Sequence, residues 1–97
     1  MEKDYELYLS GFIEGKFSFI EEMQRLYKEG LDLKEENNWS TRGYNDAIMY
    51  YNDACVKKGM PILEAINSDA KAIAMLSYMK RLEESEDYDL TGPTISL

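Results

Sequence analysis

The sequence has no histidine and a single cysteine, Cys55, among its 97 residues. Catalysis by histidine and zinc sites built from the usual sets of cysteine and histidine are therefore excluded, and no disulfide can form within the chain. Cys55 falls on an apolar helical stripe, so we interpret it as a small core residue and not as a nucleophile. A chain of this length buries a hydrophobic core without metal or disulfides, and the sequence predicts no cofactor and no metal.

The chain also lacks long apolar runs and an excess of basic residues. Its longest purely apolar runs, 47–51 and 72–76, are five residues each, which is too short to span a bilayer. Eleven basic residues against 19 acidic ones give a net charge of -8, which disfavours direct binding to nucleic acid or to an anionic membrane. The first residues, MEKDYELYLSG, carry acids where a secretory signal peptide has basic residues. We therefore expect a cytoplasmic protein of a bacterial or other host cell.

The first thirty residues carry the strongest periodic pattern in the sequence. At about 100° per residue, eleven apolar side chains gather on one half of a helical wheel, with Glu14 and Glu21 on the opposite side. The pattern predicts a long amphipathic helix from about Asp4 to Glu29. A face this wide is commonly closed by a second copy, so we also expect a homo-oligomer, most simply a homodimer. The apolar set is Tyr5, Tyr8, Leu9, Phe12, Ile13, Phe17, Phe19, Ile20, Met23, Leu26 and Tyr27.

Three further helical segments follow. A helix with Ser40 as its N-cap and Gly59 at its end carries an apolar stripe with the spacing i, i+3, i+4, i+7. A short helix at about 61–66 begins at Pro61, which suits a first turn. A fourth helix at about 69–84 has Ser68 as its predicted N-cap. Its predicted core-facing stripe is Ala72, Met75, Leu76, Met79 and Leu82.

These segments together predict an all-α fold, an irregular bundle of three to four helices over residues 1–84 with an acidic C-terminal tail over 85–97. Charge is unevenly distributed along the chain. Residues 1–36 carry 5 basic and 10 acidic groups (-5), residues 37–82 carry 6 and 4 (+2), and residues 83–97 carry none and 5 (-5). We expect this last acidic stretch to be a working surface that contacts a partner.

A weak internal echo recurs at an offset of 32 residues. Gly11-Phe12-Ile13-Glu14-Gly15 aligns with Gly43-Tyr44-Asn45-Asp46-Ala47, and Phe19 aligns with Tyr51. Small residues four apart let two helix backbones approach closely. Two interpretations have equal weight. One is a duplicated helix that forms a pseudo-twofold pair or a self-associating surface, and the other is a chance match between two amphipathic helices.

Lys16 lies in the middle of the apolar face of the first helix, and no acid stands three or four residues away from it. The favoured interpretation is that its methylene stem packs while its ammonium group reaches water. The sharper alternatives are a buried charge paired with an acid from another helix, or a pocket for a small anionic ligand. The candidate acids are Asp46, Asp53, Glu64 and Asp69.

Carboxylates and tyrosines are the remaining candidates for function. Asp46 and Asp53 are seven residues apart, whereas helical magnesium sites of nucleotide hydrolases need acids three apart on facing helices, so we predict no metal site. Eight tyrosines exceed what a core of this size needs. Tyr50 and Tyr78 lie off the apolar stripes of their helices, and tyrosine is enriched at interface hot spots.

These features predict a non-enzymatic, acidic helical interaction protein that acts by occupying a surface of a protein partner, which we expect to be basic. In style the chain resembles small inhibitors of host machinery encoded by phages or mobile elements, nucleic-acid mimics included. The alternatives are a self-assembling structural subunit, or a binder of a small anionic ligand that uses Lys16. The predicted partner-binding residues are Tyr50, Tyr78, Glu83, Glu84, Glu86, Asp87, Tyr88 and Asp89.

Overall fold

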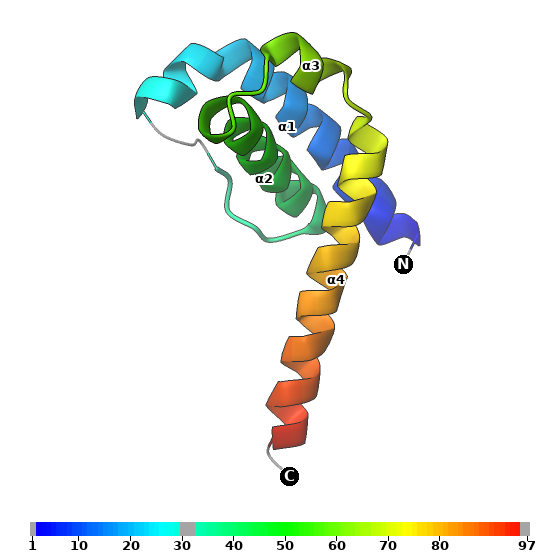
Figure 1. Ribbon diagram of the computed structural model, residues 1–97. Helices are drawn as coiled ribbons and strands as arrows, with labels where there is room; N and C mark the ends of the chain where they lie inside the picture. Colours follow the sequence, from blue (N-terminus) through cyan, green and yellow to red (C-terminus); the bar gives the residue numbers. More distant parts are fainter. Residues whose placement is uncertain (1, 30–32, 96–97) are drawn as a thin grey trace.

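The computed structural model describes the backbone of residues 2–29 and 33–95 and the side chains of residues 3–22 and 33–84. Within these ranges every regular element is a helix, which confirms the predicted all-α bundle. Figure 1 shows α1 and α2 crossing in the body of the molecule, while α4 leaves the body and projects from it. The elements are α1 (Glu2–Glu29), α2 (Trp39–Asn52), the π-helical turn η1 (Asp53–Lys57), α3 (Ile62–Asn67) and α4 (Ala70–Ile95).

The helix α1 spans the predicted range and is bent at one position. Glu22 has φ -110° and ψ 17°, outside the helical region. Before the bend, Tyr8, Phe12 and Phe19 are buried, and these three rings fall on one side of the helix at the spacing expected for a core face. The side of α1 that packs against the rest of the bundle is therefore the apolar face that the sequence predicts.

The helices α1 and α2 meet where small residues bring their backbones into contact. We call this point the glycine crossing, and it consists of Gly11, Gly15, Gly43 and Ala47. A Cβ atom on Gly11 would overlap the carbonyl oxygen of Ser40, and one on Gly43 would overlap the carbonyl oxygen of Tyr8. Because the obstacles are main-chain atoms, no side-chain movement relieves them, and glycine is required at both positions.

Contacts at the glycine crossing come in matching pairs, in which each residue is replaced by the residue 32 positions away. Gly11 meets Ser40 while Gly43 meets Tyr8, and Tyr8 stands 32 positions before Ser40. A Cβ atom on Gly15 would lie 2.8 Å from the Cβ of Ala47, its own counterpart in the echo. Such an exchange is what a twofold relation between two helices produces. The geometry therefore agrees with the pseudo-twofold interpretation, and α2 covers much of the α1 face for which we expected a second copy.

Aromatic rings dominate the core beside the crossing. Tyr8, Tyr78 and Trp39 contact one another with ring centroids 5.1–6.3 Å apart, in the tilted and edge-on arrangements that aromatic pairs favour. A second ring group joins Phe12 and Phe19 to Tyr51 at 6.1 Å. Cys55 is buried at the edge of this core, and burial raises the pKa of its thiol. Its predicted place in the core is confirmed.

Two predicted N-caps are wrong by one or two residues. The cap of α2 is Asn38, which exchanges hydrogen bonds with Thr41 in a capping box, and Ser40 already lies inside the helix. At the start of α4 the side chain of Asp69 accepts from the backbone amides two and three residues on. Ser68 instead donates to the Ala65 carbonyl at 2.6 Å and closes the end of α3. Asn, Asp and Ser are about equally good N-cap residues, so local preference alone does not select between them.

The helix α4 differs from its predicted form in two ways. It continues to Ile95, so the backbone of residues 85–95 is helical where we expected a tail beyond residue 84. It also packs on a different face. Tyr78 and Ala74 are buried, with exposures of 3% and 0%, whereas Leu76 and Met79 of the predicted core stripe are 71% and 55% exposed. At 100° per residue the buried face lies roughly 130° from the predicted stripe.

In the described ranges, no helix has both the length and the apolar character needed to span a membrane.

Candidate functional site

The position of α4 is fixed by a charged group that we call the arginine clamp, formed by Arg81, Asp46, Glu36 and Tyr8. The Arg81 guanidinium donates to both carboxylate oxygens of Asp46 at 2.7 and 2.8 Å and to both of Glu36 at 3.0 and 2.9 Å. The Tyr8 hydroxyl donates to Asp46 at 2.5 Å. Paired bidentate contacts of this kind are the strongest geometry available to arginine. The clamp therefore ties α4 to α2 and to the segment before it.

Burial and hydrogen bonding shift the pKa values of the clamp in consistent directions. Burial, and then the hydrogen bond to Asp46, raises the pKa of the Tyr8 phenol. The hydrogen bond to Asp46 raises the pKa of Arg81 and outweighs its burial. Burial would raise the pKa of Glu36, but hydrogen bonds from Arg81 and Asn45 hold it below its ordinary value. All three groups thus keep their ordinary charge at neutral pH, which suits a structural role better than proton transfer.

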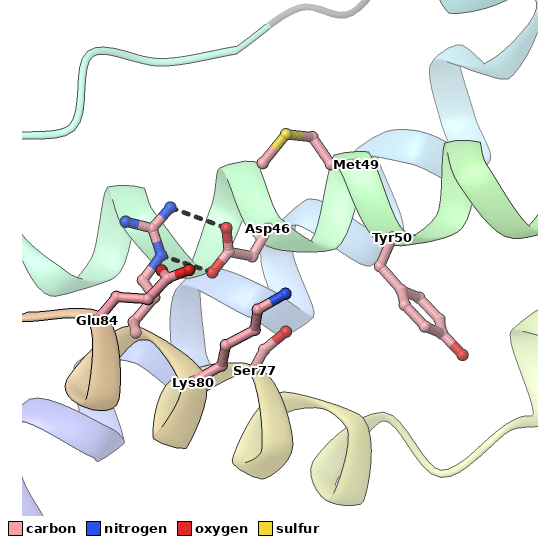
Figure 2. A pocket seen from close by; sticks show the side chains of 7 residues that line it. Asp46, Met49, Tyr50, Ser77, Lys80 and Glu84 are labelled. Atoms are coloured by element: carbon pink, nitrogen blue, oxygen red, sulfur yellow. Dashed lines mark hydrogen bonds and ion pairs between the residues drawn. The ribbon is translucent and has the colours of Figure 1, made fainter. Parts of the chain in front are cut away.

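A polar pocket of about 460 Å³ lies between α2 and α4 beside the clamp. Figure 2 shows Lys80 and Ser77 of α4 facing Asp46 and Tyr50 of α2 across this pocket. The carboxylate of Asp46 is only 13% exposed and is already occupied by Arg81, so it is not free to act as a base or a metal ligand. The pocket is therefore a mixed-charge recess in which Asp46 serves to hold Arg81.

The other side of α4 carries a larger recess of about 700 Å³ between α1 and α4, which we call the α1–α4 groove. Its floor is Tyr78, whose pKa is raised by burial and by the nearby charge of Asp4. Its walls are mainly apolar, with one charged residue from each helix, Glu6 and Lys71. A groove of this size and composition is typical of binding sites for apolar groups. The apolar wall residues are Tyr5, Leu9, Met75, Met79 and Leu82.

The predicted partner-binding residues are divided among several environments. Tyr78 is a core residue and not an exposed anchor, because its ring packs against Tyr5, Tyr8 and Trp39. Tyr50 is half-buried and lines the polar pocket, with its ring edge-on to Tyr51. Of the predicted acids, Glu83 and Glu84 are exposed on α4. The remaining predicted residues, Glu86, Asp87, Tyr88 and Asp89, lie on the helical backbone of α4, and their side chains fall outside the described part.

Lys16 lines neither the polar pocket nor the α1–α4 groove. It is half-buried on α1, and no ion pair joins it to a carboxylate in the part of the chain that the structure describes. Among its candidate partners, Asp46 is held by Arg81, and Asp53 lies 3.9 and 3.5 Å from Lys57 and Lys58. The arrangement agrees with the interpretation in which the stem packs and the ammonium reaches water.

Sequence reasoning missed both the clamp and the groove. The sequence names Asp46 as a candidate partner of Lys16 and not of Arg81. Its position between the stripe residues Tyr44 and Ala47 is a usable signal that it lies near the core. Met75 and Met79 were assigned to the core because their spacing is helical. In the described residues no cluster of acids and cysteine forms a metal site. The chain matches no family model, no curated protein and no solved structure.

Proposed function

We propose that this protein is a non-enzymatic interaction protein that acts by occupying a surface of a protein partner. The observation that carries the proposal is the exposed aliphatic stripe of α4, formed by Met75, Leu76 and Met79, which are 40%, 71% and 55% exposed. These residues have the spacing of a core face and yet face outward. Contiguous apolar surface on a small domain is the usual mark of an interaction site.

Contacts with the rest of the bundle hold the helix that carries the stripe, which supports a binding role. The arginine clamp and the Trp39–Tyr78 ring contact fix α4 from its inner side, so the outer side is presented without rearrangement. A preorganised surface loses less conformational entropy when a partner binds. The binding surface is therefore ready in the free protein.

Acidic residues follow the stripe along the same helix. Five acids stand between residues 83 and 89, on the part of α4 that projects from the body in Figure 1. Acidic surfaces steer basic partners and accelerate their association. The partner that fits best has an apolar patch bordered by basic residues. A small inhibitor encoded by a phage or a mobile element would act by occupying that patch. A pure nucleic-acid mimic would depend on the acids alone.

Capture from a host lysate tests the proposal. The wild-type protein should retain a partner in stoichiometric amount, and Leu76→Asp should lose it because a charge replaces the most exposed residue of the stripe. Leu63→Asp is the matched control, since Leu63 is 73% exposed on α3, away from the stripe. Loss of capture with both variants, or with neither, would contradict the proposal. Thermal unfolding of each variant shows whether it is folded.

A self-assembling subunit is the second candidate, and the same stripe favours it. In that case light scattering gives a mass of at least twice 11.3 kDa, and Leu76→Asp reduces the mass to that of one chain. The two candidates are therefore separated by one measurement on the purified protein.

A further inference from the structure

The α1–α4 groove has a charge pattern that specifies its occupant. Two helices form its walls, and the end of the groove near Tyr5 and Leu82 is bordered by acids from both of them. Glu6 of α1 lines the groove itself, and the exposed Glu83 stands one helical turn after Met79 on α4. Glu84 lies on the other side of α4, at the polar pocket. Lys71 lies on the groove wall eleven residues before Leu82, toward the start of α4. The groove is therefore apolar along its length and acidic at one end.

From this pattern we infer that the α1–α4 groove binds an amphipathic helix whose basic residues lie beside its apolar face. The inference deepens the proposed function, on which it rests, by naming the seat and the chemistry of the partner element. Recognition follows the helix-in-groove mode, in which apolar residues at i, i+3 or i+4, and i+7 enter a groove. Among the described elements there is no sheet edge for an extended peptide to join, and two helical walls accept a third helix by ordinary ridge-and-groove packing.

Charge complementarity selects a basic helix over a second copy of this chain. A second α4 would bring its own acidic stretch, 83–89, to a molecule whose net charge is -8. Arg81, one residue before Leu82, is already neutralised by Asp46 and Glu36. Within the described part, no ion pair joins Glu6 or Glu83 to a lysine or an arginine, so both acids are available to a cation from outside. Charges at the rim of an interface chiefly set specificity and rate of association.

The floor and walls indicate which side chains the groove takes. Tyr78 at the floor is 3% exposed, whereas Met75 and Met79 at the wall are 40% and 55% exposed. Methionine is flexible and adapts to differently shaped apolar partners, which is why it is common at helix-binding surfaces. The groove is thus suited to aliphatic or aromatic anchors without demanding one exact shape.

Synthetic peptides of about five helical turns test the inference directly. One peptide carries leucine on one face and lysine on the other, and its counterpart carries glutamate in place of lysine. The leucine/lysine peptide should bind the full chain, and the leucine/glutamate peptide should bind at least roughly tenfold more weakly. Equal binding of the two peptides would overturn the charge argument.

Single substitutions separate groove binding from general attraction to an acidic protein. Met79→Asp adds a negative charge and would strengthen a purely electrostatic association, but in the groove it should weaken the leucine/lysine peptide by about tenfold because it places a carboxylate in an apolar wall. Leu63→Asp adds the same charge outside the groove and should leave the affinity unchanged or slightly higher. If Met79→Asp binds as well as Leu63→Asp, the groove is not the seat. Met79→Gln, uncharged and tolerated at an exposed position, repeats the test should Met79→Asp unfold.

The acids are tested separately, and the outcome is distinguishable from failure of the proposed function. The pair Glu6→Gln and Glu83→Gln should weaken peptide binding by roughly threefold to tenfold at low salt, with the difference lost at high salt. The pair Glu35→Gln and Glu64→Gln is the matched control at exposed acids elsewhere. If the peptide fails to bind while partner capture still depends on Leu76, the proposed function stands and this inference fails. If Met79→Asp instead converts a dimer into a monomer in light scattering, a second copy is the occupant and the inference is wrong.

Discussion

The glycine crossing makes an unusual prediction about the sign of a mutational effect. Gly11 and Gly43 lie inside helices, where alanine ordinarily stabilises a protein by about 1 kcal/mol relative to glycine. The structure predicts the reverse, because a Cβ atom at either position overlaps a carbonyl oxygen of the other helix. We therefore expect Gly11→Ala and Gly43→Ala each to lower the free energy of unfolding.

The magnitude follows from what must move. The obstacles, the carbonyl oxygens of Ser40 and Tyr8, belong to the main chain, so the whole of one helix has to shift by roughly 1 Å to restore contact distance. Overpacking of this kind costs about 1–3 kcal/mol, and the shift also loosens the ring contact between Phe12 and Tyr51. After the gain in helix propensity is subtracted, we expect a net loss of about 2 kcal/mol, which for a domain of this size lowers the melting temperature by roughly 10 °C.

Urea unfolding and thermal unfolding of the purified variants measure the effect. Ser10→Ala is the matched control, since Ser10 neighbours Gly11 in α1 but is exposed, and its replacement should raise stability slightly through helix propensity alone. Should Gly11→Ala and Gly43→Ala prove as stable as the wild type or more so, α1 and α2 do not meet backbone to backbone and the pseudo-twofold description of the pair is wrong.

Four further predictions concern polar groups of the core and of the arginine clamp. The Tyr51 hydroxyl is buried and has no hydrogen-bond partner by geometry in the described structure, and burial raises the pKa of this phenol. Tyr51→Phe should therefore be neutral or stabilising by up to about 1 kcal/mol. Tyr8→Phe removes a donor from a buried carboxylate and should destabilise by about 1–2 kcal/mol in the same urea assay. Arg81→Met leaves the carboxylates of Asp46 and Glu36 without their cation. Because these two side chains are 13% and 33% exposed, we expect the free energy of unfolding to fall by about 2 kcal/mol, which is less than for a fully buried pair. A neutral result for Arg81→Met would show that the clamp does not hold α4. Folding lowers the pKa of Glu36, so the contribution of this carboxylate to the free energy of unfolding is present at neutral pH and is lost as pH falls below about 4.5. In the wild type the urea midpoint should fall between pH 5 and pH 3, and Glu36→Gln should make this fall smaller. An equal fall in the variant would contradict the prediction.

Much of the fold was predictable because the helical pattern is strong wherever the apolar and polar faces of a helix differ clearly. The end of α1 at Glu29 and the short α3 after Pro61 follow from residues whose local preferences and tertiary contacts agree. The caps were missed by one or two positions, since Asn38 and Asp69 stand next to serines that are nearly as good in isolation. Their selection depends on where the preceding segment arrives, which a local pattern does not contain.

The candidate site was less predictable, because it depends on pairings across long stretches of sequence. Arg81 meets Glu36 across 45 residues and Asp46 across 35. Each of these three residues alone looks like a solvated charge. Only the approach of α4 to α2 makes them partners, and that approach depends in turn on the close crossing of α1 and α2.

The orientation of α4 shows how ring and charge contacts override an aliphatic pattern. Turned with Met75, Leu76 and Met79 inward, the helix would bury three flexible or aliphatic side chains but would lose the contacts of Tyr78 with Tyr5, Tyr8 and Trp39. It would also carry Arg81 away from Asp46 and Glu36 and leave a buried carboxylate without its cation, which is far costlier than leaving a methionine in water. The side chains that a hydropathy pattern counts as polar are therefore the ones that hold α4 in place. For this reason the aliphatic stripe stays outside, where the partner helix that we propose would reach it.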